Sequence, residues 1–176
     1  FSYPRRLQEL PNGDIYYLNG FGRKDLFKAK REGIAIVGYD PPTGVFADLA
    51  KLPDGTSTLV FRGLYSERFD LYGRLIRMQD RNDNSMEFFY DAAGRLTVVM
   101  DTMGRLYTFD YYLFDGTATA GRLKSVTDFT GRAVVYSYDE RGDLRTATLS
   151  QRVRAYTYEA NETNLAFAHN LTTVTD

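Results

Sequence analysis

Few residues of this chain have the chemistry of a catalytic group. His169 is the only histidine among 176 residues, and there is no cysteine. Nucleophilic catalysis needs a base beside an activated hydroxyl or thiol, and no Ser/Asp pattern near His169 supplies such a triad. We therefore expect a protein that is not an enzyme, with no cofactor and no bound metal.

A second cluster carries oxygen ligands at alternate positions. Asp80-Arg-Asn-Asp-Asn84 spaces carboxylate and amide groups as a calcium loop does, and Asp91 falls at the position of that loop's last ligand. Such loops need a glycine at the sixth position and a long glutamate at the end. Both are absent, so a hairpin turn is the favoured interpretation.

Two further motifs are typical of cell-surface proteins. Arg141-Gly142-Asp143 is an integrin-type tripeptide, but Gly142 also serves as the glycine of a repeated turn, and we favour the turn. Asn161-Glu-Thr163 and Asn170-Leu-Thr172 are glycosylation sequons, which have a meaning only in a secreted eukaryotic protein. Neither kind of motif identifies a functional site in this chain.

The elements that position these side chains form a short repeat. An aspartate, two variable residues and a glycine recur between strand-like runs, most often 10 or 11 residues apart. The turn residues are Asp70 and Gly73, Asp91 and Gly94, Asp101 and Gly104, Asp128 and Gly131, and Asp139 and Gly142, with Asp80–Asp83 as a glycine-free variant. A short period is typical of units that bury apolar surface against their neighbours, which places function on the assembled surface.

The residue types of the repeat predict hairpin turns. Aspartate at the first turn position accepts a hydrogen bond from the backbone two residues on, and glycine at the fourth adopts the left-handed conformation. Six glycines are followed by arginine, namely Arg23, Arg74, Arg95, Arg105, Arg122 and Arg132. Pairing of each arginine with a carboxylate of its own repeat is favoured over a row that binds sugar or phosphate.

Between the turns, side chains alternate as in half-buried strands. Aromatic residues occupy every second position in three runs: Phe88 and Tyr90; Tyr107, Phe109 and Tyr111; and Tyr136 and Tyr138. This parity predicts an aromatic stripe on one face of a meander, with Tyr90, Tyr111 and Tyr138 at equivalent positions. Leu96 and Val99 are three residues apart, which requires either a bulge or partial cover of both faces.

The first part of the chain is less regular. All five prolines lie at or before Pro53, so residues 54–176 contain none to interrupt a strand ladder. We divide the chain into a divergent lead-in rich in strands and turns, residues 1–62, and repeats at residues 63–176. Lys24–Glu32 is the only helix candidate, and its charge makes a solvated loop or ribbon an equal alternative.

Composition excludes several functions. Lys and Arg number 22 against 23 for Asp and Glu, which leaves no basic field for nucleic acid and argues against a membrane-surface role. No apolar run reaches the length of about 18 residues that spans a bilayer. The chain is long enough for one domain, and its last residues match the middle of a repeat, so we expect a piece of something longer.

Four phrases resemble RHS/YD repeats: Tyr90-Asp-Ala-Ala-Gly-Arg-Leu96, Asp101-Thr-Met-Gly-Arg-Leu106, Gly121-Arg-Leu-Lys-Ser-Val-Thr-Asp128 and Gly131-Arg-Ala-Val-Val-Tyr-Ser-Tyr-Asp139. The resemblance covers residues 63–176. It implies an all-β fold, in which an antiparallel meander of hairpins forms a curved sheet that is a segment of a spiral β-shell. Asp83, Asp143 and Glu159 depart from the repeat pattern, which puts those individual turns in doubt.

The RHS/YD family includes bacterial Rhs polymorphic toxins, insecticidal Tc toxin B and C subunits and teneurin receptors. The resemblance implies that this chain is a structural segment of a shell that encapsulates a toxin or other cargo polypeptide in an exported protein, secreted or at the cell surface. Its partners are then the remainder of the shell and the enclosed cargo. The alternative is an extracellular adhesion module that binds a glycan or a protein at the cell surface.

Overall fold

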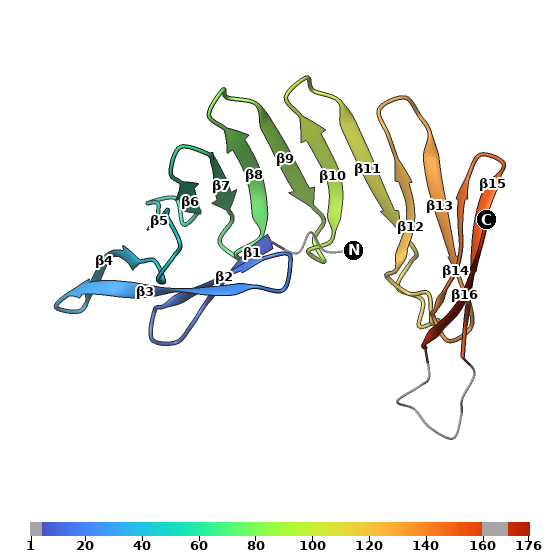
Figure 1. Ribbon diagram of the computed structural model, residues 1–176, viewed down its shortest axis with the longest axis horizontal. Helices are drawn as coiled ribbons and strands as arrows, with labels where there is room; N and C mark the ends of the chain where they lie inside the picture. The colour runs from blue at the N-terminus through green and yellow to red at the C-terminus, as the bar shows by residue number, and fades with distance from the viewer. Residues whose placement is uncertain (1–4, 160–168) are drawn as a thin grey trace. The chain divides into compact units, whose positions relative to one another are not determined.

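The computed structural model describes residues 5–159 and 169–176, and every regular element in these residues is a β-strand (Figure 1). Paired strands run antiparallel and follow one another in chain order. The expected all-β fold, built as an antiparallel meander, is confirmed. None of the described residues forms a helix of the length and apolarity that a membrane-spanning helix needs.

The chain divides into two compact units, which we call the first unit (Ser2–Arg105) and the second unit (Leu106–Asp176). The first unit begins with a four-stranded ribbon of β1 (Arg5–Glu9), β2 (Ile15–Asn19), β3 (Lys24–Glu32) and β4 (Ala35–Asp40). The sequence left a helix, a loop and a ribbon open for Lys24–Glu32, and the segment is strand β3. Asp25 and Phe27 are buried whereas Lys24 and Lys28 are exposed, which is the period of a strand.

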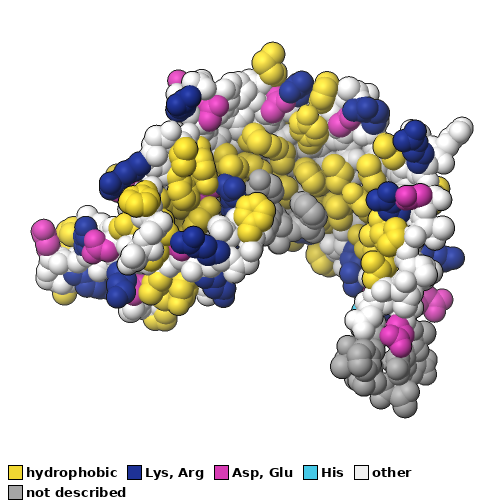
Figure 2. All heavy atoms as spheres, viewed as in Figure 1, with side chains coloured by type: hydrophobic (Ala, Val, Ile, Leu, Met, Phe, Trp, Pro, Cys, Tyr) yellow, Lys and Arg dark blue, Asp and Glu magenta, His cyan; other side chains and the backbone are white. Residues whose placement is uncertain are grey.

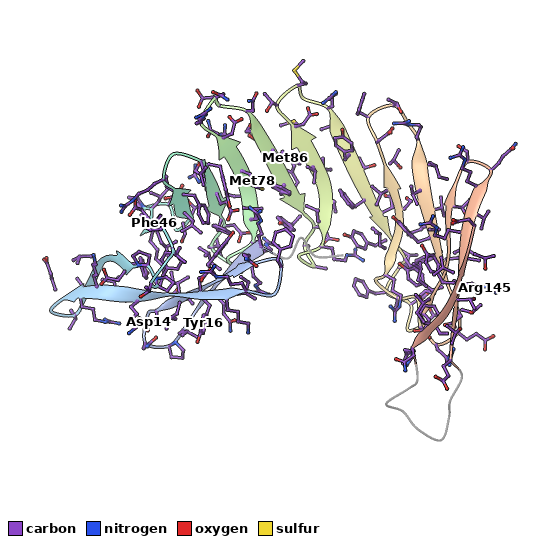
Figure 3. The ribbon with its side chains drawn as sticks, viewed as in Figure 1. Asp14, Tyr16, Phe46, Met78, Met86 and Arg145 are labelled. Atoms are coloured by element: carbon purple, nitrogen blue, oxygen red, sulfur yellow. The ribbon has the colours of Figure 1, made fainter. Side chains whose placement is uncertain are left out.

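The rest of the first unit is a meander of β5 (Ala47–Lys51), β6 (Ser57–Phe61), β7 (Tyr65–Phe69), β8 (Leu75–Asp80), β9 (Ser85–Tyr90) and β10 (Leu96–Asp101). Residues that lie opposite one another in register share a face, as Met78 and Met86 do (Figure 3). Large side chains of this face are at most 2% exposed at Leu59, Phe69, Leu75, Phe88 and Leu96. This face therefore holds most of the core of the first unit.

The ribbon packs on that face. The ring centroid of Tyr17 in β2 lies 5.9 Å from that of Phe61 and 6.3 Å from that of Phe69. The backbone N–H of Leu7 in β1 donates to the carbonyl of Gly73, at 2.8 Å, in the turn between β7 and β8. The lead-in is thus fixed to the first repeats by both aromatic contacts and a backbone hydrogen bond.

A β-bulge recurs at the start of alternate strands. Tyr90 of β9 lies opposite Leu96 of β10, and the next pair skips Thr97. The extra residue turns Leu96 and Val99 to the same face, where both are buried. Of the two explanations for their spacing, the bulge is confirmed. The same register shift follows Leu75, Leu123, Leu144 and Leu171.

The second unit contains β11 (Leu106–Tyr111), β12 (Leu123–Thr127), β13 (Ala133–Tyr138), β14 (Leu144–Leu149), β15 (Arg152–Tyr158) and β16 (Leu171–Thr175). These strands pair in chain order within one sheet, and Arg145 is the unpaired residue of the bulge in β14 (Figure 3). Phe109 lies opposite Val126 and Tyr136 lies opposite Ala147. Both aromatic rings are half-buried, in contrast to the buried Phe88 of the first unit.

Hydrophobic and charged side chains separate on the surface. Figure 2 shows hydrophobic side chains gathered over the strands, with basic and acidic side chains together at the hairpin tips. Phe46 is an exception, because it lies in the loop between β4 and β5 and is 77% exposed (Figure 3). The separation follows from alternation within strands and from turns that carry aspartate and arginine.

Gly73 provides a test of how the lead-in is attached. A Cβ at this position would overlap the carbonyl oxygen of Leu7, in addition to the strain of a φ of 74°. We expect Gly73→Ala to lower the free energy of unfolding by about 1–2 kcal/mol from the backbone strain and by a further ~1–3 kcal/mol from the clash. Urea unfolding followed by circular dichroism measures the loss.

Gly104→Ala is the matched control. Gly104 has a φ of 75°, but a Cβ there meets no atom within 4 Å, so only the strain is expected. Amide hydrogen exchange of β1 and β2 should rise in Gly73→Ala and stay unchanged in Gly104→Ala. Equal losses of stability in the two variants, with no change in exchange of β1, would contradict the attachment of the lead-in at Gly73.

Candidate functional site

The repeated turns are the most regular arrangement of functional groups in the chain. In the turn between β7 and β8, Oδ1 of Asp70 accepts hydrogen bonds from the backbone N–H groups of Tyr72 and Arg74, both at 2.9 Å. Oδ2 of Asp70 accepts from Nε of Arg74 at 2.7 Å. The N–H of Gly73 donates to the carbonyl of Asp70 at 2.9 Å. One carboxylate therefore satisfies the turn and holds the arginine that follows it.

The same geometry recurs along both units. Oδ1 of the aspartate accepts two backbone N–H groups and Oδ2 accepts from the arginine in three more turns: Asp91 with Arg95, Asp101 with Arg105, and Asp128 with Arg132. The glycines have φ between 74° and 85° at Gly73, Gly94, Gly104, Gly131 and Gly142. Asp139 keeps both backbone contacts, although Asp143 replaces the arginine. Only glycine adopts this φ without strain, so the residue type at each turn is determined by the backbone.

These hydrogen bonds lower the pKa of several turn aspartates. Burial would raise the pKa of Asp91, but the hydrogen bonds donated by the backbone and side chain of Arg95 outweigh it. The hydroxyl of Thr130 is the main cause of the lowered pKa of Asp128. Because the folded pKa lies below the ordinary value of 3.8, this stabilisation is present above that value and is lost as the pH falls through the lowered pKa.

The calcium-like segment is a turn whose carboxylate has its own donors. Oδ1 of Asp80 accepts from the backbone N–H groups of Asn82 and Asn84, and Oδ2 accepts from the side-chain amide of Asn84 at 2.9 Å. Asp83 stands in the place of glycine, with a φ of 64°. Among the residues that the structure describes, no group of three or more His, Cys, Asp or Glu could hold a metal ion.

His169 meets Asp143, one of the residues that depart from the repeat. Nδ1 of His169 lies 2.7 Å from Oδ1 of Asp143. Arg141 lies 3.7 Å from the carboxylates of both Asp139 and Asp143, and Gly142 is buried, so the integrin-type tripeptide is folded into the turn. In this turn Asp143 stands where the other turns have arginine, and Arg141 and His169 both contact its carboxylate.

The remaining departure from the repeat, Glu159, directly follows β15. The N–H of Glu159 donates to the carbonyl of Asn170 at 2.9 Å, where the chain enters β16. Asn170 begins one of the two sequons. The sequon at Asn161 lies outside the described residues.

The aromatic residues of the expected stripe lie on matching positions of their strands. Phe88 is 2% exposed, whereas Tyr90, Tyr107, Phe109, Tyr111, Tyr136 and Tyr138 are half-buried. The hydroxyl of Tyr90 donates to the carbonyl of Leu75 at 2.7 Å, and the hydroxyl of Tyr138 donates to the carbonyl of Leu123 at 2.8 Å. Both tyrosines thus reach the leucine that starts the preceding strand, which ties one hairpin strand to the next.

Tyr112 makes aromatic and hydrogen-bond contacts that the sequence pattern did not predict. Its hydroxyl donates to the carbonyl of Tyr136 at 3.0 Å, and its ring meets the ring of Tyr138 edge to face at 6.0 Å. Tyr107 makes a similar edge contact with Phe129, at 5.9 Å. Tyr112 lies one residue past the end of β11, where strand parity no longer predicts the direction of a side chain.

Four of the six arginines after glycine make the same contact, and the other two have different partners. Arg74, Arg95, Arg105 and Arg132 form ion pairs with the aspartate of their own turn. Arg23 pairs instead with Asp25, at 2.8 Å. Arg122 donates from Nε to the carbonyl of Ala118 and lies 5.4 Å above the ring of Tyr138. Pairing with the aspartate of the same turn therefore accounts for four of the six arginines.

A buried charge cluster in the first unit was not predicted. Glu67 of β7 is 1% exposed and forms an ion pair with Arg5 of β1, and its Oε2 has no hydrogen-bond partner. Burial raises the pKa of Glu67, partly offset by Arg5 and Tyr17. The signal in the sequence was parity, because Glu67 falls on the same face as Tyr65 and Phe69. A carboxylate on the apolar face of a strand requires a cationic partner from elsewhere.

Comparison with known proteins finds likeness to solved structures but no match by sequence. Neither a protein-family model nor a curated protein matches the sequence. One solved structure that the chain resembles is the crystal structure of TcdB2-TccC3-TEV, with a TM-score of 0.47 and 13% sequence identity over 96% of this chain. This chain spans only 9% of the length of the chain that it matches.

Asp91 tests the contribution of a turn carboxylate. We expect Asp91→Ala to lower the free energy of unfolding by ~1–2 kcal/mol, because two backbone N–H groups lose their acceptor. Asp91→Asn should cost less, since the amide oxygen keeps both hydrogen bonds and the partly exposed ion pair with Arg95 contributes only about 0–1 kcal/mol. Urea unfolding measures both, with Glu140→Ala as an exposed control. Equal losses for Asp91→Ala and Asp91→Asn would show that Asp91 stabilises the protein through its ion pair with Arg95 and not through its hydrogen bonds to the turn backbone.

The raised pKa of Glu67 predicts that the stability of the protein depends on pH. Its folded pKa lies above the ordinary value of 4.5, so between that value and the raised pKa the native state binds more protons than the unfolded state. Stability from this site is therefore greatest below about 4.5 and falls as the pH rises through the raised pKa. The charged and titratable groups that face Glu67 are Arg5, Tyr17 and Tyr65.

The comparison with Glu67→Gln isolates this site. Urea unfolding at a series of pH values should show wild-type stability falling relative to the variant as the pH rises from 4.5. The loss of stability below about 3.8, which comes from the turn aspartates, should be common to both proteins. Parallel pH profiles across the whole range would contradict a raised pKa at Glu67.

Proposed function

We propose that this chain is a wall segment of β-hairpin repeats that helps to enclose a cargo polypeptide in an exported protein, and that it carries out no catalysis itself. The observation that carries the proposal is the repetition of one turn and one bulge. Asp70, Asp91 and Asp128 make the same set of contacts, and the same register shift follows each recurring leucine. A sheet built in this way grows by adding hairpins, without any new kind of core.

The partial burial of aromatic residues in the second unit supports a wall more than a compact catalytic domain. On one face of the second unit, Phe109, Tyr136 and Tyr138 remain half-buried, so neighbours in the same sheet shield them only in part. A half-buried aromatic face can contact an apolar guest chain, and it loses water when it does so. A wall thereby stabilises what it encloses without recognising a particular sequence.

A second candidate function is an extracellular adhesion module. One observation favours it: Phe21, Phe46 and Leu64 are 86%, 77% and 64% exposed, and they line one groove of about 300 Å³ in the first unit. Exposed apolar clusters of this kind mark contact sites for other proteins. The groove is compatible with either proposal, because the rest of a shell would also contact the first unit.

Limited proteolysis of the native protein, purified from its source, tests enclosure. We expect one polypeptide segment to be cut slowly in native buffer and rapidly once urea unfolds the repeats, because a β-wall keeps the protease from its substrate. Mass spectrometry of the fragments identifies the protected segment.

The control is the protected polypeptide added separately to the folded repeats, which should be cut as fast as the polypeptide alone. If every segment outside the repeats is cut at the same rate in native buffer as in urea, the wall encloses nothing. The adhesion module would then be the better account.

A further inference from the structure

Three of the four methionines of the chain line one hollow of the first unit. They are Met78 of β8, Met86 of β9 and Met103 in the turn that follows β10. The hollow has a volume of about 330 Å³, which is within the range of about 300–1,000 Å³ that is typical of ligand sites. The chain has no cysteine, so these thioethers bring sulfur together at one place.

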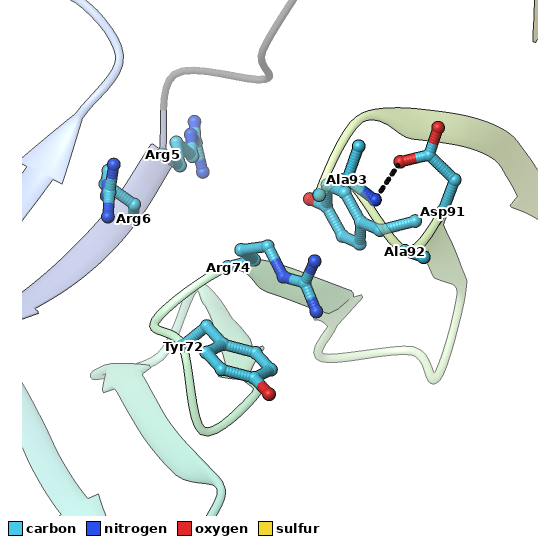
Figure 4. Close-up of a pocket in the computed structure, with 9 residues that line it drawn as sticks. Arg5, Arg6, Tyr72, Arg74, Asp91, Ala92 and Ala93 are labelled. Carbon is cyan, nitrogen blue, oxygen red and sulfur yellow. Dashed lines mark hydrogen bonds between the residues drawn. The ribbon is translucent and has the colours of Figure 1, made fainter.

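Two other hollows of the first unit have different linings. The groove at Phe46 is lined largely by aromatic and aliphatic side chains. In the hollow of Figure 4, the charged side chains Arg5, Arg74 and Asp91 are each paired with a charged residue of the protein. Neither lining contains a methionine. The concentration of sulfur therefore distinguishes the hollow at Met86, which we call the methionine hollow.

The register of the sheet brings the three methionines together. Met78 lies directly opposite Met86 on the neighbouring strand (Figure 3), and Met86 lies directly opposite Asp101. Residues opposite one another have Cβ atoms about 4.5–5.5 Å apart and share a face of the sheet. Met103 follows Asp101 by two residues. The thioethers thus come from three neighbouring strands or their turns, and methionine has enough rotatable bonds to direct its sulfur into the space between them.

The methionine side chains are more accessible than those of a core. Met86 is 41% exposed and Met103 is 78% exposed, whereas Phe88, on the same face of β9 as Met86, is 2% exposed. Met78 is half-buried, and its Sδ lies 4.0 Å from Nη1 of Arg5, whose charge is offset by the ion pair with Glu67. An ion can therefore reach the hollow from solvent while the sheet stays folded.

The carboxylates of the lining are already engaged. Both oxygens of Asp80 and both oxygens of Asp101 accept hydrogen bonds within their own turns. Calcium and magnesium need several oxygen ligands that are free to coordinate. The charged side chains of the lining are Asp80, Asp101 and Arg105, which leaves one negative charge in excess. The hollow thus attracts a cation and offers it sulfur rather than oxygen.

We propose that the methionine hollow binds a soft monovalent metal ion, copper(I), through the thioether sulfurs of Met78, Met86 and Met103. Thioethers are neutral and polarisable, and ligands of this kind select copper(I) among the metal ions of proteins. Three neutral ligands leave the single charge of the ion, which the excess negative charge of the lining offsets. This binding goes beyond the wall role and does not depend on it, because a wall can enclose cargo with or without a metal ion on this face.

The sequence-based expectation of no bound metal concerned other ligands. It rested on the absence of cysteine and on the poor match of Asp80–Asn84 to a calcium loop. The three methionines have no motif spacing, and only the pairing of β8 with β9 and of β9 with β10 places them at one hollow. A thioether site is therefore invisible to a search for thiolate, imidazole or carboxylate clusters.

Titration of the full chain with metal ions tests the site. Silver(I) nitrate in a chloride-free buffer is the air-stable probe, measured by isothermal titration calorimetry. Copper(I), kept reduced under nitrogen, is measured by competition with bicinchoninate. We expect a single ion of each kind to bind per chain, and zinc(II) and calcium(II) to bind at least tenfold more weakly, because both prefer ligands that this hollow lacks.

Leucine variants remove the sulfur but keep the side-chain volume. Met86→Leu and Met103→Leu should each weaken silver(I) and copper(I) at least tenfold, since each removes one of three ligands. Met100→Leu is the matched control, because Met100 lies opposite Glu87, on the other face of β10 from Asp101. This variant should bind both ions as the wild type does. All three variants should unfold within a few degrees of the wild type, because the substitution conserves volume.

Nuclear magnetic resonance locates the ion independently of the variants. With methionine methyl groups labelled with carbon-13, silver(I) should shift the signals of Met78, Met86 and Met103, the thioethers that coordinate it. The signal of Met100 should stay in place.

Several results would overturn the proposal. These are no binding of either ion, wild-type affinity in both Met86→Leu and Met103→Leu, an equal loss of affinity in Met100→Leu, or zinc(II) binding as tight as that of copper(I). Silver(I) that shifts the Met100 signal as much as the other three would also contradict a site at this hollow. None of these results bears on the protease protection that tests the wall.

Discussion

The hydrogen bonds between a turn aspartate and its own backbone are the constraint on which the repeats depend. A strand has a side-chain period of two, so a slip of one residue would exchange its buried and exposed faces. The turn prevents the slip because Oδ1 of Asp101 must reach the N–H groups of Met103 and Arg105 together, while Gly104 takes a φ of 75°. The register of each hairpin is thereby specified by its own turn and does not require contact with the next hairpin.

The bulge after each recurring leucine converts this register into a core. Without it, Leu96 and Val99 would point to opposite faces, and one of them would lose its cover. With it, both join Phe88 on one face, while the hydroxyl of Tyr90 reaches back to the carbonyl of Leu75. Turn and bulge act together, since the turn determines which residues pair and the bulge determines which of them are buried.

The sequence predicted what depends on neighbours in the chain and missed what depends on distant residues. Turn aspartates, glycines and aromatic parity are visible within a few positions, so the meander followed from the sequence alone. The pairing of Glu67 with Arg5 joins residues 62 apart, and the fit of Gly73 against Leu7 joins the lead-in to a repeat. No local pattern specifies such contacts. For Lys24–Glu32 the local pattern was ambiguous, and pairing with β2 and β4 made it a strand.

Equivalent residues of the repeat show that burial is a property of neighbouring strands and not of the residue itself. Leu75 and Leu96 are 0% and 1% exposed, Leu123 is 9% exposed, and Leu171 of β16 is 53% exposed, although all four occupy the same place beside a bulge. Within the described residues, β16 has a partner strand on one side only. The repeat therefore carries its stability at the contact between hairpins, and each added hairpin buries the leucine of the one before it. A sheet stabilised in this way can vary its loops and turns freely, because the contacts that bury its core lie between strands.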